Sequence, residues 1–491
     1  MKKMRNIVAA LLCLCALSVG VSAQNPKKVK PSDKATIDGV TYMFTPKMLE
    51  AKVIRSETVY EGDILLPDTV RQDSLLYTVV EIEGRAFYKS NITSVTIAST
   101  IRKIGSGAFE ECNSLEAISI PVNVVDWGTG LFANCKNLED VYLPENMKEL
   151  PNDTFEGCSA LQTVDLPSSI THIGSDAFEG CTNLKKISLP NSVVEIGKDA
   201  FKECASLTEV SLPNGLKTIA SGAFERCVSL KSIELPKSLT KIESDLFKSC
   251  SNLQEVTIPN SVKTIGSEAF EGCADLRGIV LPSSISGVGS SVFRDCSSLE
   301  RIEIPTGLSK LSANMFQGCS NLQEVKIAFS VKSIGNDAFK GCARLDSVYI
   351  PNSVKNMDSS VFEDCANLRV VQLSNSVKVL PAKLFRGCTN LDNVVIPNSV
   401  GDIKDDVFRG CSSLTSITIP VSVKKMGNDV FKDCDSLSEI VMRSATPPKI
   451  SSDTFDKNVL RNATLYVPTL LSYQGEKEKR WVKFANMVAR R

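Results

Sequence analysis

Residues 184–204 read LKKISLPNSVVEIGKDAFKEC, and close copies of this stretch recur at a fixed interval along most of the chain. The interval is marked by a cysteine that recurs every 23 residues, fifteen times, from Cys112 to Cys434. A phenylalanine stands three residues before each of these cysteines and a leucine three residues after it. Self-similarity with a period of this length is the sequence signature of a solenoid, in which each module forms one turn.

The first part of the module predicts a β-strand. Residues 184–189 follow the pattern L-x-x-I-x-L, whose last step alternates between apolar and polar residues as a half-buried strand does. Pro190 then ends the strand, because proline has no backbone N–H to donate to a sheet.

The second part of the module predicts a return path. Val193 and Ile196 carry the chain back along the far side, and Gly197 permits a sharp bend. Residues 200–201 are expected to form a short helical turn before Cys204 closes the module.

A single module of this kind leaves a hydrophobic edge open, which only the next module can cover. The fold class is therefore predicted to be an α/β-type solenoid of 23-residue turns, with a parallel β-sheet on one face, short helical turns on the other and a cap at each end. Sixteen strands stacked at the usual spacing give a sheet about 75 Å long.

These residues closely resemble the BspA-like leucine-rich-repeat family of bacterial surface proteins, whose repeat reads L-x-x-I-x-I-P-x-S-V-x-x-I-G-x-x-A-F-x-x-C. The resemblance implies that residues 60–67 and 76–82 form a β-hairpin that opens the array, and that residues 445–448 and 465–468 form its closing unit. It also implies adhesion to host matrix proteins, host cells or other bacteria.

The N-terminus indicates export. Lys2, Lys3 and Arg5 precede an apolar run over residues 7–17, and the segment closes on small residues at Ala23, as in a secretory signal peptide. The run is too short to span a bilayer, and no later stretch is long enough, so no transmembrane segment is expected. The predicted location is the cell surface or the medium, with the periplasm as an open alternative.

The chain is accordingly divided into four parts: a signal peptide over 1–23, a β-rich N-terminal cap over 24–86, about sixteen repeats over 87–443, and a C-terminal cap over 444–491. The tail from Tyr473 to Val488 reads as one amphipathic helix, with Trp481 and Phe484 on its apolar face. This helix is expected to cap the array, and a basic membrane or partner contact is the alternative.

The regular cysteine ladder admits three interpretations: disulfides, a metal site, or core. Neighbouring cysteines lie one turn apart with parallel side chains, which holds their β-carbons too far apart for an unstrained disulfide. Zinc needs four ligands that converge on one point, and a linear stack does not supply them. Buried free thiols are therefore predicted, with no metal and no cofactor.

Some modules depart from the pattern, and local bends or bulges are expected at those positions. Three residues replace the strand-ending proline, two prolines replace the bend glycine, and one tryptophan replaces the usual isoleucine: Ala328, Ser374, Arg443, Pro151, Pro381 and Trp127.

Catalysis is not expected. His172 is the only histidine and no catalytic motif accompanies it, so neither a histidine-based metal site nor a Ser-His or Cys-His nucleophilic system is expected. The chain is electrically neutral, and removing the signal peptide leaves a small net negative charge, which excludes nucleic acid as a partner. The protein is therefore predicted not to be an enzyme.

The outward strand positions form the remaining candidate surface, because they vary on a rigid frame. They hold more acids than bases, namely Asp140, Asp165, Glu209, Glu234, Glu255, Glu303, Glu324 and Glu439 against Lys186, Arg301 and Lys326. Either these acids keep the face solvated, or they dock a basic partner. An apolar patch is also predicted on successive turns at Tyr349, Val370 and Val395.

The function predicted from the sequence is that of an exported binding protein for adhesion to, or recognition of, a protein or glycan macromolecule. The candidate binding residues are Asp140, Asp165, Glu209, Glu234, Tyr349, Val370 and Val395. The alternative is a periplasmic or envelope scaffold that has no host ligand.

Overall fold

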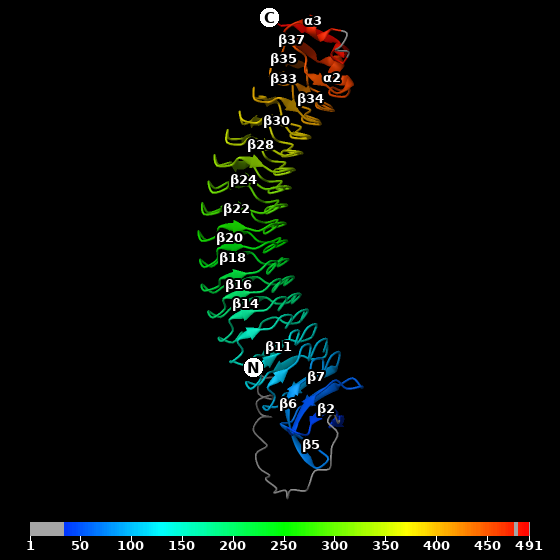
Figure 1. Cartoon of the computed structure of the whole chain (residues 1–491), viewed down its shortest axis with the longest axis vertical. Helices are drawn as coiled ribbons and strands as arrows, with labels where there is room; N and C mark the ends of the chain where they lie inside the picture. Colours follow the sequence, from blue (N-terminus) through cyan, green and yellow to red (C-terminus); the bar gives the residue numbers. More distant parts are fainter. Residues whose placement is uncertain (1–33, 476–479, 491) are drawn as a thin grey trace.

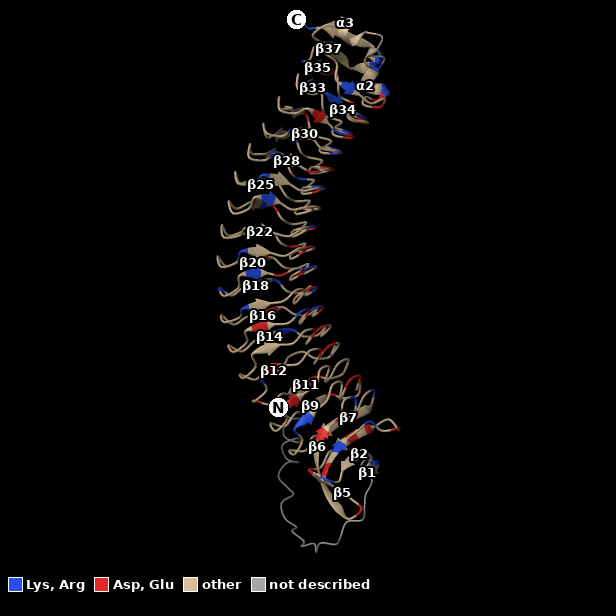
Figure 2. Cartoon of the chain, viewed as in Figure 1, with Lys and Arg blue, Asp and Glu red and all other residues tan. Residues whose placement is uncertain are grey.

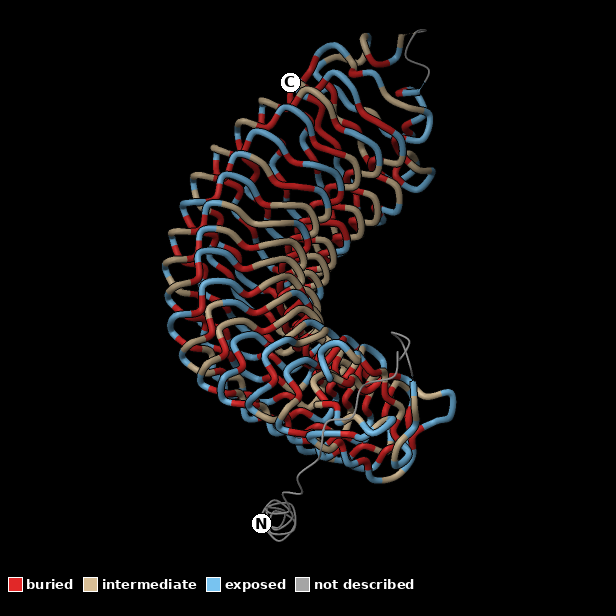
Figure 3. Tube along the Cα trace, turned by 60° about the horizontal axis from the view of Figure 1, so that its bottom comes forward, coloured by how far each residue is buried: buried red, intermediate tan, exposed pale blue. Residues whose placement is uncertain are grey.

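The computed structural model describes residues 34–475 and 480–490, where the chain forms a long, curved coil of stacked turns (Figure 1). About 18 turns follow one another with a period of about 23 residues. Buried residues line the inside of the coil on every turn, and exposed residues lie outside (Figure 3). The predicted signal peptide over 1–23 lies outside the described residues.

Many of the strands that begin successive modules pair in parallel, as predicted; in one such pair Lys186 stands beside Glu209, one period further on. We call the outward surface of these strands the strand face. The strands do not form one continuous sheet, because the turns around Val164 and Ile279 carry no strand there and the rest divide into short sheets. The strands are β9 (Ala117–Ser119), β11 (Asp140–Tyr142), β14 (Lys186–Ser188), β16 (Glu209–Ser211), β18 (Ser232–Glu234), β20 (Glu255–Thr257), β23 (Arg301–Glu303), β25 (Glu324–Lys326), β27 (Ser347–Tyr349), β29 (Val370–Gln372), β31 (Asn393–Val394), β33 (Ser416–Ile419) and β35 (Glu439–Met442).

A second ladder, which the sequence did not predict, runs along the return side of the coil. It consists of two-residue parallel strands that place one exposed and one buried residue on most turns, as in Glu195 and Ile196. We call its outward surface the return face. Its strands are β8 (Lys103–Ile104), β10 (Asp126–Trp127), β12 (Glu149–Leu150), β13 (His172–Ile173), β15 (Glu195–Ile196), β17 (Thr218–Ile219), β19 (Lys241–Ile242), β21 (Thr264–Ile265), β22 (Gly287–Val288), β24 (Lys310–Leu311), β26 (Ser333–Ile334), β28 (Asn356–Met357), β30 (Val379–Leu380), β32 (Asp402–Ile403), β34 (Lys425–Met426) and β36 (Lys449–Ile450).

The predicted helical turns are not confirmed. Around Phe201 the chain forms two hydrogen-bonded turns, in which Lys202 N–H donates to the Asp199 carbonyl at 3.0 Å and Cys204 N–H to the Phe201 carbonyl at 3.2 Å. Asp199 and Glu203, two residues on either side of the phenylalanine, have φ values of 53° and 60°. Left-handed residues at both positions interrupt any α-helix, and this pattern recurs along the array.

The glycine after the return strand does not serve as a bend residue, which corrects the prediction for Gly197. Its φ is not left-handed. A β-carbon added there would lie 2.5 Å from the Ser175 nitrogen and 2.6 Å from the Gly174 carbonyl carbon of the preceding turn. At Gly197 the absence of a side chain lets the backbones of successive turns approach closely.

The return ladder breaks at four of the turns that lack this glycine, at Pro151, Glu243, Ser312 and Pro381, and continues at three others, at Ala220, Asp358 and Lys404. In an intact turn the glycine N–H donates to the preceding strand, as from Gly174 to the Leu150 carbonyl at 2.8 Å. Proline has no such donor, so Pro151 and Pro381 cannot extend the ladder. The strand pairing shows no register shift at Ser374 or Arg443.

The core of the coil is a stack of phenylalanine rings from Phe87 to Phe455, with neighbouring centroids 5.2 to 5.9 Å apart. The fifteen cysteines of the array lie beside this stack as buried free thiols. Each donates its S–H to a phenylalanine carbonyl of the preceding module, as Cys204 does to Phe178 at a sulfur–oxygen distance of 3.2 Å. The predicted burial of the cysteines is thus confirmed.

The N-terminal cap differs from the hairpin that the resemblance implied. Strand β4 does not pair with β6; it pairs in parallel with β7 and so begins the strand face. The hairpin partner of β6 is β5. The strands are β1 (Lys34–Ile37), β2 (Val40–Thr45), β3 (Glu50–Val53), β4 (Glu61–Leu65), β5 (Thr69–Gln72), β6 (Leu75–Ile82) and β7 (Asn91–Thr96).

The C-terminal cap is not built on the single helix predicted over 473–488. Its described residues form α2 (Lys457–Asn462), β37 (Thr464–Val467), α3 (Leu470–Tyr473), the 3₁₀ turn η2 (Trp481–Lys483) and β38 (Asn486–Ala489). Strands β37 and β38 extend the strand ladder from β35, and the buried Trp481 packs on Phe455 at the end of the ring stack. No helix among the described residues combines the length and the apolar character needed to cross a bilayer.

Candidate functional site

All seven candidate binding residues lie exposed on the strand face, spread over much of the array: Asp140, Asp165, Glu209, Glu234, Tyr349, Val370 and Val395. Charged residues of both signs occur along the whole coil (Figure 2). The strand ladder alone therefore does not define one site. Local geometry separates the candidates into groups.

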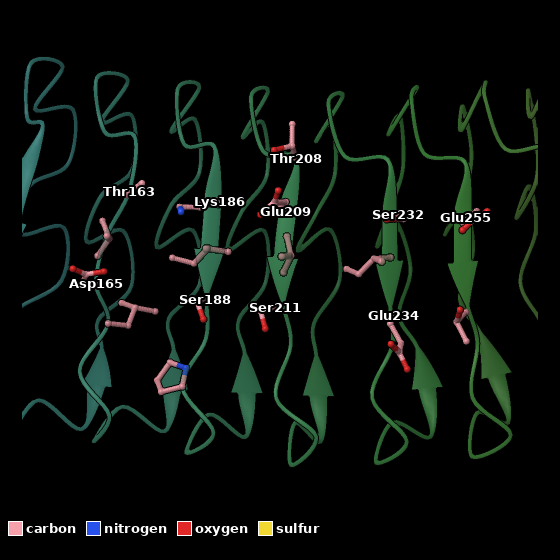
Figure 4. Close-up of a pocket in the computed structure, with 17 residues that line it drawn as sticks. Thr163, Asp165, Lys186, Ser188, Thr208, Glu209, Ser211, Ser232, Glu234 and Glu255 are labelled. Atoms are coloured by element: carbon pink, nitrogen blue, oxygen red, sulfur yellow. The ribbon is translucent and has the colours of Figure 1, made fainter.

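A hollow of about 990 Å³ gathers the acidic candidates on the strand face. It extends from residues 163–166 across β14, β16 and β18 to β20, and the labelled side chains lie side by side on successive turns (Figure 4). Its carboxylates come from Asp165, Glu209, Glu234 and Glu255, whereas Asp140 lies outside it. The structure thus brings three of the four predicted acids together and adds Glu255.

These four carboxylates face a single cation, the ammonium group of Lys186. Among the residues that the structure describes, no ion pair within 4.0 Å involves any of the five groups. Glu324, by contrast, lies 3.6 Å from Lys326 on the same strand. The hollow therefore carries an excess of unneutralised negative charge, which attracts cationic groups from solution.

The hollow is otherwise lined by small polar side chains. Ser188, Ser211 and Ser232 lie between the acids, together with Thr163, Thr208 and Thr257. Hydroxyl groups both donate and accept hydrogen bonds, so an extended chain laid across the turns finds partners for its polar groups. This arrangement suits binding and contains no nucleophile–base pair.

The apolar candidates do not form the continuous patch predicted from the sequence. Tyr349 stands in register with Gln372, and Val370 stands between Ser347 and Asn393, so polar residues separate them. Tyr349 instead contacts Phe329, a residue that sequence reasoning missed, with ring centroids 6.4 Å apart in an edge-to-face arrangement.

Phe329 is 76% exposed, and the sequence carried a signal for it. It follows Ala328, which replaces the strand-ending proline, at a position that is polar in most modules. A large aromatic side chain exposed beside a second ring is a typical anchor for a partner.

The buried thiols are poor candidates for chemistry. Burial raises the pKa of Cys158 and of Cys250 to about 12, so both remain protonated at neutral pH. A protonated, buried thiol is neither a nucleophile nor a metal ligand. No group of three or more His, Cys, Asp or Glu in the described part of the chain is arranged to hold a metal ion.

Comparison with solved structures finds similar proteins, of which the first shares this architecture. A leucine-rich-repeat protein from Bacteroides ovatus is 30% identical, with 84% of this chain and 99% of that chain covered and a TM-score of 0.59. A leucine-rich cell-surface protein from Faecalibacterium prausnitzii is 25% identical, with 86% and 96% covered and a TM-score of 0.37. No curated protein matched.

The family model for the BspA-type leucine-rich-repeat region matches over residues 80–204, 171–300, 244–369, 288–403 and 358–471. These matches cover the phenylalanine and cysteine ladders and both strand ladders described above. The matches together span residues 80–471, and the chain belongs to the BspA-type leucine-rich-repeat family.

Proposed function

We propose that the protein is an exported, non-catalytic binding protein of the bacterial cell surface, which serves adhesion or recognition by holding a protein or glycan macromolecule on its strand face. The observation that carries this proposal is the acidic hollow. There the regular coil presents several unpaired charges of one sign in a shared concavity. Family membership supports the binding role, because repeats of this kind expose a long surface on a rigid frame.

The charge of the hollow favours a partner segment that carries lysine or arginine side chains. Exposed charges contribute more to the rate of encounter than to the final affinity, and salt screens them. Replacing the acids of the hollow should therefore slow association and flatten its dependence on ionic strength.

The eight strand acids divide into two matched sets, which makes a controlled test possible. Four line the hollow, and four lie outside it: Asp165, Glu209, Glu234 and Glu255 against Asp140, Glu303, Glu324 and Glu439. Replacing either set by serine changes the net charge equally and removes no buried group. The mature protein would first be used to capture ligands from host matrix and bacterial envelope extracts.

Association kinetics of a captured ligand would then be measured with both serine variants at two salt concentrations. The hollow variant should associate more slowly than the outside variant, and circular dichroism should show that both fold normally. Equal kinetics for the two variants would refute the hollow as the docking site.

A scaffold that meets only the bacterium's own envelope components is the second candidate, favoured by the length and regularity of the coil. Surface labelling of intact cells separates the two candidates, because an adhesion protein is labelled and a periplasmic scaffold is not. A screen of the purified protein against hydrolase substrates tests the absence of catalysis.

A further inference from the structure

A second hollow, of about 750 Å³, lies on the return face between the turns of β10 and β12. Strand β10 ends one sheet and β12 begins the next, and Pro151 stands where an intact turn donates a glycine N–H to the preceding strand. The break in the ladder and the hollow thus coincide. The same holds at Pro381, where a hollow of about 560 Å³ lies beside the break between β28 and β30.

Only the first of these two hollows contains an aromatic ring, that of Trp127. Trp127 stands in register with Ile104, in the inward column of the return ladder. The indole is too large for that column, so it packs partly on the core and remains partly exposed in the hollow. Its N–H has no hydrogen-bond partner among the described residues.

Planar polar side chains surround the indole. Asp126 comes from the same strand, Glu149 and Asn152 come from the next turn, and Lys148 adds an ammonium group that makes no ion pair with a described residue. Carboxylates and carboxamides can engage two neighbouring hydroxyl groups at once, and the flat face of an indole packs against the C–H face of a pyranose ring.

We propose that the hollow at Trp127 binds a neutral oligosaccharide. Its volume lies within the range of small-ligand sites, and it combines one aromatic platform with a few convergent polar groups. A basic peptide is less suited to it, because Asp126 is already paired with Lys103 at 3.1 Å and Lys148 adds positive charge. The site lies on the return face, so it does not depend on the proposed role of the strand face.

Tryptophan fluorescence reports directly on this site. The chain has two tryptophans, and Trp481 is fully buried in the C-terminal cap. Emission that acrylamide quenches therefore comes from Trp127. Oligomers of glucose, galactose, mannose and N-acetylglucosamine would be titrated into the mature protein, and calorimetry would supply affinities that do not depend on fluorescence.

At least one of these oligosaccharides should bind and protect the emission from acrylamide. Trp127→Ile restores the usual residue of the column and should weaken binding at least about tenfold. Glu149→Gln alters only an exposed carboxylate and should weaken binding several-fold. Glu195→Gln is its matched control, because Glu195 lies in the same exposed column but outside the hollow.

Failure of all the oligosaccharides to bind would overturn the proposal, and so would equal affinities for the Trp127→Ile, Glu149→Gln and Glu195→Gln variants. If circular dichroism shows that the Trp127→Ile variant is unfolded, the proposal is tested by comparing the oligosaccharide affinities of the Glu149→Gln and Glu195→Gln variants alone. The serine variant of the strand-face hollow should bind the oligosaccharide as the unchanged protein does, so the two proposals can fail separately.

Discussion

The buried positions and the outward strand positions of the same turns differ in how far their residues repeat. Inside, a phenylalanine and a cysteine recur on fifteen successive turns, and both are buried on each of them. Outside, the neighbouring strand positions hold an acid, a base, a serine or an aromatic ring from one turn to the next. Repetition in the core specifies the fold many times over, whereas the local character of the surface depends on a few turns that differ from the others.

The largest expected effect comes from the thiol ladder, because identical buried groups act together. Burial raises the pKa of Cys158 from 9.0 to about 12. Between these two values an unfolded thiol loses its proton while a folded one keeps it, so stability falls as pH rises. Each such thiol should lower the free energy of unfolding by up to about 1.4 kcal/mol per pH unit in this window.

Thermal melting followed from pH 7 to pH 10.5 checks this expectation. The midpoint should fall steeply above about pH 9, and replacing Cys158, Cys181 and Cys204 by alanine should make the fall shallower. Thiol counting provides a second check: fifteen groups should react after denaturation without reductant and few in native buffer. A denatured protein without reactive thiols would show that the ladder is oxidised.

The next largest effect concerns one ring of the core stack. Phe201 lies between Phe178 and Phe224, with centroid distances of 5.2 and 5.4 Å. Phe201→Ala should reduce the free energy of unfolding by about 3–5 kcal/mol, because the rigid turns above and below cannot close the cavity. Phe329→Ala, at a ring that is 76% exposed, is the matched control and should change stability by less than about 0.5 kcal/mol. Similar urea midpoints for the two variants would mean that the stack contributes little.

A smaller effect, on partner binding, is expected from the exposed aromatic pair of Tyr349 and Phe329. If Tyr349 and Phe329 anchor a partner, Tyr349→Ala should weaken binding by more than about 1 kcal/mol, chiefly through faster dissociation. Thr418→Ala, three turns further on in the same outward column, is a suitable control because Thr418 is exposed and is not a candidate binding residue. Dissociation rates unchanged in Tyr349→Ala would exclude this corner as an anchor.

The smallest effect, on stability, concerns the neighbouring carboxylates around Asp176. Burial and the nearby Glu179, Asp199 and Asp153 raise the pKa of Asp176 to about 6. The folded chain therefore binds a proton there more readily than the unfolded chain, so ionisation of Asp176 destabilises the fold at pH 7. Asp176→Asn should raise the melting temperature slightly at pH 7, with the gain vanishing below about pH 4, where Asp is protonated in both states. Asparagine also tolerates the left-handed φ of 55° at this position. A lower melting temperature at pH 7 would contradict this expectation.

Several features of the fold could be predicted from the sequence, because they repeat. The period of 23 and the burial of Phe201 and Cys204 follow from patterns that no local departure disturbs. The return ladder was missed because Glu195–Ile196 is too short to show a periodicity. The helix predicted over 473–488 was wrong because the spacing of Trp481 and Phe484 also fits a single 3₁₀ turn.

The candidate surfaces were harder to predict than the fold. Alternation along the strands identifies Asp165, Glu209 and Glu234 as exposed, but it does not show that they share a hollow from which Asp140 is absent. The hollow extends from a turn without a strand across two separate sheets, so the grouping depends on how the turns stack, which the pattern within one turn does not show. The same limit applies to Trp127 and Pro151, because both departures from the pattern were visible in the sequence but the hollow that they line together was not.

The direction of the thiol hydrogen bonds affects how such a protein can gain or lose whole modules. Every cysteine from Cys112 to Cys434 donates backwards to the preceding module, and most of these donor–acceptor pairs are 26 residues apart. Deleting or duplicating one module of 23 residues therefore recreates the same donors, acceptors and ring contacts at the new junction. A gene that encodes this coil can gain or lose whole turns by recombination between its repeats, and the reach of the protein can change while its core remains the same.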